Sequence, residues 1–320
     1  MNKIDLDKLK ESTSNVIGKM NAVSKKVETS ISNNTNTISK KVSNKIDITK
    51  DQLKNNIDQN GDGQITIEDI IIMGLKVPGI KINRSEFIKK EFSKYYSEEV
   101  IENIIKYNPA HENIPINKIS KIADDVIQYD RLCVSGISTA LSAPGGFAMV
   151  ATLPTDIAQY YGYMLRATQE LLYLYGFPEI DINSQQLLDS ETINTLIVCM
   201  GVMYGVAGAN TALKSMAKAL GAGVEKKLIN KALTKGTIYP IVKSVAKWFN
   251  VRMTKEIFAG FFKKSIPVVG GVIGGSITYL SFKPCCEKLK ITLENTKLSN
   301  PKYIETIEEN IMTDNILVSQ

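Results

Sequence analysis

Residues 58–69 place oxygen-bearing side chains at the alternating positions that a hard cation needs. Their sequence is Asp-Gln-Asn-Gly-Asp-Gly-Gln-Ile-Thr-Ile-Glu-Asp. Ca²⁺ takes about six to eight oxygen ligands at about 2.3–2.6 Å. With Asp58 as position 1, Asn60 and Asp62 stand at positions 3 and 5, and Gly63 stands at position 6, where the chain has to turn sharply. The spacing therefore predicts a twelve-residue loop that binds Ca²⁺.

The second half of this loop supplies the remaining ligands and one departure from the usual EF-hand pattern. Gln64 offers its backbone carbonyl at position 7, and Thr66 at position 9 ligates directly or through a water molecule. Position 12 is Asp69, where the pattern has a glutamate. Because aspartate is shorter, we expect weaker calcium binding or better tolerance of Mg²⁺. The predicted metal ligands are Asp58, Asn60, Asp62, Gln64, Thr66 and Asp69.

Two short helices are expected to hold the loop. Thr49 or Asp51 can cap an entering helix over Lys50–Ile57, and an exit helix spans Ile67–Leu75. The alternative is a turn rich in Asn, Asp and Gly that binds no metal. EF-hands usually pair through position 8, here Ile65, and the sequence shows no second loop. A homodimer through this loop, or a protein partner, is therefore a hypothesis to test.

Composition and cysteine usage indicate a globular protein in a reducing compartment. The chain has 320 residues, 43% of them hydrophobic and 22% charged, which allows about two domains. Its first 50 residues contain no apolar segment typical of a signal peptide, which favours a cytoplasmic location. The four cysteines have no metal or redox spacing, and the single histidine excludes sites that need two histidine ligands.

The basic side chains gather in one part of the chain. The net charge is +6, and residues 211–290 contain 15 Lys and Arg against 3 Glu. Lysine-rich amphipathic surfaces favour anionic membranes or nucleic acid. Interleaved aromatic residues and a recognised nucleic-acid fold are missing, so we expect no nucleic acid. The predicted partner is an anionic membrane surface or a membrane protein, on the inner face of the membrane.

Apolar residues recur at helical spacing along most of the chain, and no alternating strand pattern is visible. We predict an all-α fold, a multi-helix bundle with apolar helical hairpins preceded by a single EF-hand. The expected helices are Ser85–Tyr107, one starting near Ile119, Asp156–Tyr175, Asp189–Ala209 and Thr211–Leu233. The predicted domains are a polar lead (1–47), the EF-hand module (48–78), a helical domain (79–295) and an acidic polar tail (296–320). The lead is either an amphipathic helix that orders on a partner or a membrane, or a disordered segment.

Three segments are apolar enough to raise the question of a membrane: Val134–Pro154, Ile193–Ala209 and Ser265–Phe282. The last two are at the short limit for spanning a bilayer. Small residues within them permit close approach between helices. They are interpreted either as buried helices of a tightly packed core or as segments that insert into or attach to a membrane.

These segments also carry a family resemblance. The blocks that show it are Ser138–Phe147, Ala151–Asp156, Gln159–Arg166, Leu174–Pro178 and Lys264–Gly275. Together they resemble the EcsC family of bacterial proteins over about residues 80–295. The resemblance implies a helical, membrane-associated protein, named for a locus that also encodes an ABC transporter. It implies no reaction and no catalytic residues, and a calcium loop is not part of the family's usual pattern.

Polar residues of the predicted helix Asp156–Tyr175 have two interpretations. In the first, Pro154 starts the helix, Asp156 favours the positive end of its dipole, and Arg166 and Glu170 form a solvent-exposed pair four residues apart. In the second, Asp156, Arg166 and Gln169 line a polar pocket of an enzyme that acts on a lipid or a phosphorylated substrate. The first, non-enzymatic interpretation is the one we favour.

Overall fold

The computed structural model describes residues 57–59, 61, 63–142, 149–180, 190–222, 229, 231–233, 235–264 and 269–300. The chain divides into two compact units, Met1–Gln52 and Leu53–Gln320, and every described residue belongs to the second. The predicted polar lead and most of the predicted acidic tail lie outside the described residues. Within the described ranges the structure consists of helices joined by turns and contains no strand, which confirms the all-α prediction.

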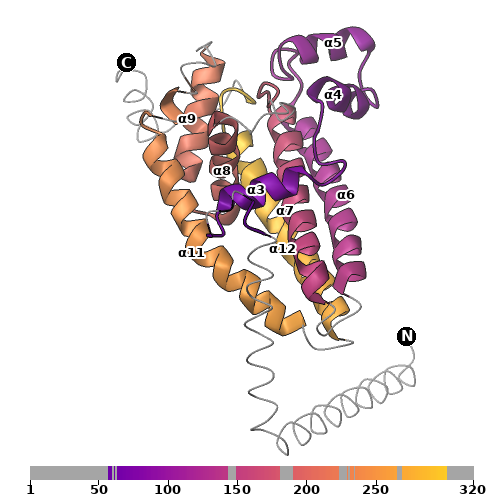
Figure 1. The fold of residues 1–320 in the computed structure, drawn as a ribbon. Coiled ribbons are helices and arrows are strands. Elements are labelled where there is room, and N and C mark those ends of the chain that lie inside the picture. The colour runs from indigo at the N-terminus through magenta and orange to yellow at the C-terminus, as the bar shows by residue number, and fades with distance from the viewer. Residues whose placement is uncertain are drawn as a thin grey trace, which may run out of the picture. The chain divides into compact units, whose positions relative to one another are not determined.

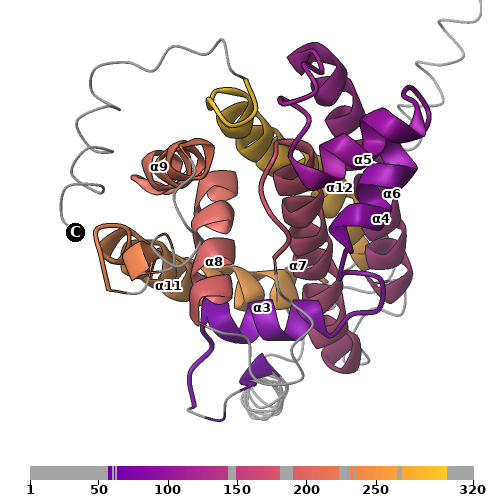
Figure 2. The same cartoon turned by 90° about the horizontal axis from the view of Figure 1, so that it is seen from above.

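Three long helices, α6, α7 and α12, run side by side at the centre of the bundle (Figures 1 and 2). Their bounds are Ile116–Ser142, Met149–Leu174 and Val269–Glu294. Helices α6 and α12 are antiparallel. Arg131 Nε donates to the carbonyl oxygen of Tyr279 at 2.7 Å, and Lys290 Nζ lies 2.6 Å from Asp124 Oδ1. Several apolar side chains of α7 are fully buried, among them Met164, Leu165, Leu171 and Leu172.

A second group of helices packs beside these three: α8 (Ser190–Tyr204), α9 (Ala209–Gly221) and α11 (Tyr239–Lys264). Helix α8 is buried on most of its surface, since every side chain from Leu196 to Met200 is fully inaccessible. At its end, the ring of Tyr204 packs against Phe249 of α11 with 5.1 Å between centroids. The apolar segment Ile193–Ala209 is therefore a core helix of the bundle for most of its length.

Helix α3 (Ile67–Leu75) lies across the bundle and packs against α7 (Figures 1 and 2). Its bounds agree with the predicted exit helix of the loop. The crossing depends on two glycines. A Cβ on Gly74 would lie 3.0 Å from the backbone nitrogen of Gly162, and a Cβ on Gly162 would lie 3.1 Å from the carbonyl oxygen of Gly74. The backbones therefore touch at a point where no side chain fits.

The predicted single helix Ser85–Tyr107 is wrong. The structure has two helices there, α4 (Arg84–Phe92) and α5 (Glu98–Lys106), which form a hairpin. Arg84, at the start of α4, donates to the carbonyl oxygens of Ile104, Ile105 and Tyr107 at the end of α5 and to that of Phe177 after α7. This contact requires the chain to turn back, which one straight helix could not do.

Two other predicted helix boundaries also need correction. Helix α7 begins at Met149, so Pro154 and Asp156 are its sixth and eighth residues rather than its first turn. The predicted role of Asp156 at the helix dipole therefore does not apply. The helix predicted over Thr211–Leu233 ends at Gly221, and residues 223–228 lie outside the described part. Of the helices that the structure describes, none is long and apolar enough to cross a membrane.

Replacing Gly162 with alanine is expected to destabilise the fold, because the new methyl group would meet the carbonyl oxygen of Gly74 and the side chain of Ile80. Overpacking of this kind costs about 1–3 kcal/mol in the free energy of unfolding. Urea denaturation followed by circular dichroism measures this change.

Gly136 provides the matched control. It lies in the exposed part of α6, and a Cβ there would have nothing within 4 Å. Gly136→Ala is therefore expected to stabilise the helix by up to about 1 kcal/mol. Equal stabilities of the two variants would contradict the close α3–α7 crossing.

Candidate functional site

The first part of the predicted calcium loop is closed by the carboxylate of Asp58. Its Oδ1 accepts a hydrogen bond from the amide of Gly61 and its Oδ2 accepts one from the amide of Gly63, both at 2.7 Å. Both glycines have positive φ, 73° and 79°, a region that L side chains rarely adopt. The carboxylate of position 1 therefore points into the loop, and a glycine is required at position 6. The predicted ligands Asn60 and Asp62 lie outside the described residues.

Thr66 and Asp69 close the other end of the loop. They form a reciprocal capping box at the start of α3, in which Asp69 Oδ2 accepts from the Thr66 amide at 2.8 Å and from its hydroxyl at 2.7 Å. Asp69 Oδ1 accepts from the amide of Gln59 at 2.9 Å, which ties position 2 to position 12. Asp69 is fully buried, whereas the side chain of Gln64 is exposed.

The donor set of this loop fits a hard cation in part. All six predicted ligands offer oxygen. Asp58 bonds to the loop amide of Gly61, while Asp69 bonds to Thr66 and to Gln59, the neighbour of Asp58. Each oxygen of Asp69 already accepts at least one hydrogen bond, so Asp69 would have to share its lone pairs with the ion. Among the described residues, no group of three or more His, Cys, Asp or Glu side chains could hold a metal.

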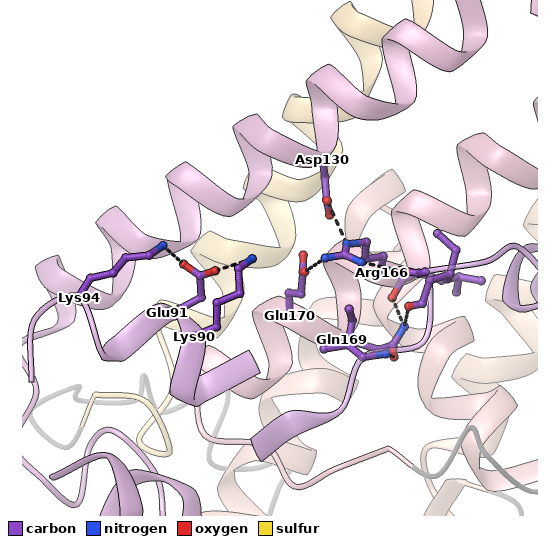
Figure 3. Close-up of polar contacts among 11 residues, drawn as sticks. Lys90, Glu91, Lys94, Asp130, Arg166, Gln169 and Glu170 are labelled. Atoms are coloured by element: carbon purple, nitrogen blue, oxygen red, sulfur yellow. Dashed lines mark hydrogen bonds and ion pairs between the residues drawn. The ribbon is translucent and has the colours of Figure 1, made fainter. Parts of the chain in front are cut away.

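A second polar cluster lies on α7, and it contains two of the residues singled out in the sequence (Figure 3). Arg166 Nε lies 3.1 Å from Asp130 Oδ1 of α6, and its Nη2 lies 2.8 Å from Glu170 Oε1. Its Nη1 donates to the carbonyl oxygen of Gly79. The side chains of Asp130 and Glu170 are 0% and 3% exposed, and that of Arg166 is 18% exposed. The expectation of a solvent-exposed Arg166–Glu170 pair is therefore wrong.

Gln169 holds the connector, residues 76–83, which joins α3 to α4. Its Nε2 donates to the carbonyl oxygens of Ile80 at 3.0 Å and Leu165 at 2.9 Å, and its Oε1 accepts from the amide of Ile82 at 3.0 Å. Gln169 is fully buried, so it takes part in fixing the backbone of the connector. Its polar atoms and those of Arg166 are bonded to the protein itself.

Asp156 is not part of this cluster. It precedes Arg166 by ten residues in α7, which is about 15 Å along the helix axis. Its side chain lies outside the described residues. Of the three predicted catalytic candidates, the structure therefore brings together Arg166 and Gln169 only.

Burial dominates the electrostatics of the cluster. It raises the pKa of Asp130 to about 6, against the opposing effects of Glu170 and Arg166. Burial, followed by repulsion from Asp130, also raises the pKa of Glu170 well above its ordinary value. Within the described part of the chain, each carboxyl group has one buried oxygen without a hydrogen-bond partner, Asp130 Oδ2 and Glu170 Oε2.

Asp130 was missed in the sequence, although a signal was present. The buried residues of α6 include Ala123, Val126, Ile127 and Val134, and Asp130 stands on the same stripe. A carboxylate inside an apolar stripe needs a partner on another element. Its partner could not be identified, because Arg166 is 36 residues away in the sequence.

Comparison with known proteins gives no related protein whose site could be compared with the loop or with the α7 cluster. No family model, curated protein or solved structure matches the chain. The resemblance to the EcsC family therefore stays a prediction, and the function has to be argued from the geometry of the loop and of the α7 cluster.

The replacement Gln169→Leu is expected to loosen the connector at similar side-chain volume. It leaves the Ile80 carbonyl and the Ile82 amide without their partner. A buried backbone group left unsatisfied costs about 1–3 kcal/mol, so the two groups together are expected to lower the free energy of unfolding by about 2–6 kcal/mol. Chemical denaturation measures the loss, and hydrogen exchange should show reduced protection of the Ile82 amide.

Gln159→Leu is the matched control, since Gln159 is a half-buried glutamine of the same helix about 15 Å away along the axis. It should leave the protection of Ile82 unchanged. Unaltered exchange at Ile82 in the Gln169 variant would refute the role assigned to this side chain.

Proposed function

We propose that this chain is a calcium-binding, non-enzymatic helical protein of the EcsC type that docks on an anionic membrane surface in the cytoplasm. The observation that carries the calcium proposal is the geometry of Asp58, whose carboxylate points into the loop and accepts the amides of Gly61 and Gly63. This is the arrangement expected of position 1 in a loop that closes around an ion.

The ion would be held by Asp58, Asn60, Asp62, the carbonyl of Gln64, Thr66 and Asp69. Asp69 serves two purposes in this proposal, as a ligand and as the residue that caps α3. Because its oxygens already accept hydrogen bonds, we expect moderate affinity and tolerance of Mg²⁺. The two positive charges of the ion would balance the negative charges of the loop carboxylates.

Binding at the loop would act on the helical body because α3 is attached to that body at several points. The amide of Ile67, the first residue of α3, donates to Asn250 Oδ1 of α11 at 3.1 Å. Gly74 near its other end touches Gly162 of α7. Beyond α3, the connector is held by Gln169. A change in the loop is therefore transmitted to α7 and α11 without an intervening linker.

Membrane docking is supported by the distribution of exposed lysines. Several lysines of residues 211–290 are exposed, among them Lys231, Lys235, Lys243 and Lys247. In α11, Lys243 and Lys247 are four residues apart, and Val242, Val245 and Phe249 on the other face are buried. This part of α11 is therefore amphipathic, with a basic outer face that suits anionic lipid headgroups.

The calcium proposal is tested by calorimetric titration of the intact chain with CaCl₂. Asp58→Ala should abolish the binding heat, because it removes a ligand and the acceptor of two loop amides. Calcium should also raise the stability of the wild type, by about 2.7 kcal/mol at a free concentration 100 times the Kd. Asp125→Ala, at an exposed acid of α6, is the control and should bind as the wild type does. Identical heats for Asp58→Ala and wild type would refute the site.

The docking proposal is tested by flotation with vesicles of phosphatidylcholine alone or mixed with phosphatidylglycerol. The chain should float with the anionic vesicles only, and high salt should release it because it screens the lysines. The flotation is run once with calcium and once with a chelator. For the wild type, the fraction of protein that floats with the anionic vesicles should differ between the two conditions, whereas for Asp58→Ala it should not. Equal recovery from neutral and anionic vesicles, or no recovery from either, would contradict the proposed partner.

A further inference from the structure

The α7 cluster contains more acid than base. Asp130 and Glu170 approach one guanidinium, that of Arg166, and each gives it a single oxygen (Figure 3). Both carboxyl groups thus approach the same side chain, and the charge of Asp130 adds to the effect of burial in raising the pKa of Glu170. If both were ionised, the cluster would carry one uncompensated negative charge in a region with almost no solvent. Two carboxylates that share a buried site do not both ionise at the usual pH.

The unpartnered oxygens of the pair show where a proton would fit. Asp130 Oδ2 and Glu170 Oε2 are buried and have no hydrogen-bond partner among the residues that the structure describes. A buried acceptor without a donor is costly, and two acceptors cannot satisfy each other. A single proton changes this, because one carboxyl then donates an O–H to the other. It also makes the cluster electrically neutral, with one carboxylate against one guanidinium.

Other groups around the pair do not remove the imbalance. Lys90 of α4 favours the ionised acids, but its ammonium is bound to Glu91 at 3.1 Å, and its side chain is 67% exposed and therefore screened by solvent. Tyr163 of α7 interacts with Asp130 as a phenol. Cys286 of α12 is buried, which raises the pKa of its thiol and keeps it neutral. The connector contributes the Gly79 carbonyl to Arg166. Its two lysines, Lys76 and Lys81, are exposed and screened by solvent, and Lys76 donates to Gln59 Oε1 at 2.7 Å.

We propose that Asp130 and Glu170 form a proton-binding site, which holds one shared proton at neutral pH and links the packing of α6, α7 and the connector to pH. The shared proton resides on Glu170 and is donated to Asp130. On release it passes to solvent and leaves a buried negative charge beside Arg166, whose other bond holds the connector at Gly79. This inference is independent of the proposed calcium binding.

The direction of the pH effect follows from the raised pKa values of the pair. In the unfolded chain both carboxyls ionise near pH 4, whereas in the folded chain burial keeps a proton on the pair to higher pH. The contribution to stability is therefore fully present below pH 4 and is lost as the pH rises through the pKa of the folded pair. Glu91 has the opposite effect on stability. Burial raises its pKa, but Lys94 and Lys90 lower it further, so its stabilising contribution is lost only as the pH falls below the ordinary pKa of a glutamate.

The test is the slope of unfolding free energy against pH in the intact chain between pH 5 and the pKa of the pair. Divided by 2.303RT, this slope gives the number of protons exchanged on unfolding. The wild type should release about one proton more than Glu170→Gln, because the amide keeps the neutral form of the side chain at every pH. Glu91→Gln is the matched control, a buried glutamate paired with two lysines, and its slope should equal that of the wild type.

Infrared difference spectroscopy provides a second measurement that does not need a stable variant. The wild type should show the C=O stretch of a protonated carboxyl group at pH 7, which disappears at higher pH and is missing from Glu170→Gln. Asp130→Asn replaces Glu170→Gln if the latter does not fold, and the wild-type titration alone decides if neither folds. Parallel slopes for wild type and Glu170→Gln, or no protonated carboxyl signal at pH 7, would overturn the proposal.

Discussion

The cost of burying polar side chains on α7 is the constraint on which the arrangement of the helices depends. Arg166, Gln169 and Glu170 project from about one turn of this helix into the interior. Buried polar groups are tolerated only when they find hydrogen-bond partners. Their partners here are the backbone of the connector and Asp130 of α6. The need for partners therefore determines both the path of the connector and the way α6 packs on α7.

The loop at residues 58–69 is connected to the helical body through α3. Helix α3 lies between the loop and the connector, and it is held by Asn250 at its start and by Gly162 near its end. The loop is therefore part of the same compact unit as the long helices. Helix α3 and the connector therefore join the loop to the buried cluster through a few direct contacts.

The features that the sequence predicted correctly are local ones. Helix α3 has the bounds predicted from the sequence, and in the structure its start is capped by Thr66 and Asp69, which are three residues apart. The features that it did not predict depend on partners far along the chain. The break between α4 and α5 follows from Arg84, which bonds to carbonyls about 20 residues away. The burial of Arg166 and Glu170 follows from Asp130 and the connector, because spacing along α7 does not reveal which face another element covers.

The attachment of the α4–α5 hairpin has a consequence for which substitutions it can accept. Arg84 donates hydrogen bonds to four carbonyl oxygens in two separate parts of the chain, at the end of α5 and after α7. It does so because a guanidinium is planar and presents its donors as a rigid fork. A lysine would keep the positive charge, but its single ammonium group could not donate hydrogen bonds to both parts of the chain at once. The α4–α5 hairpin is thus joined to the bundle by the shape of the Arg84 side chain more than by its charge. Exchanging this arginine for lysine, which is usually a mild substitution, would be a severe one at this position.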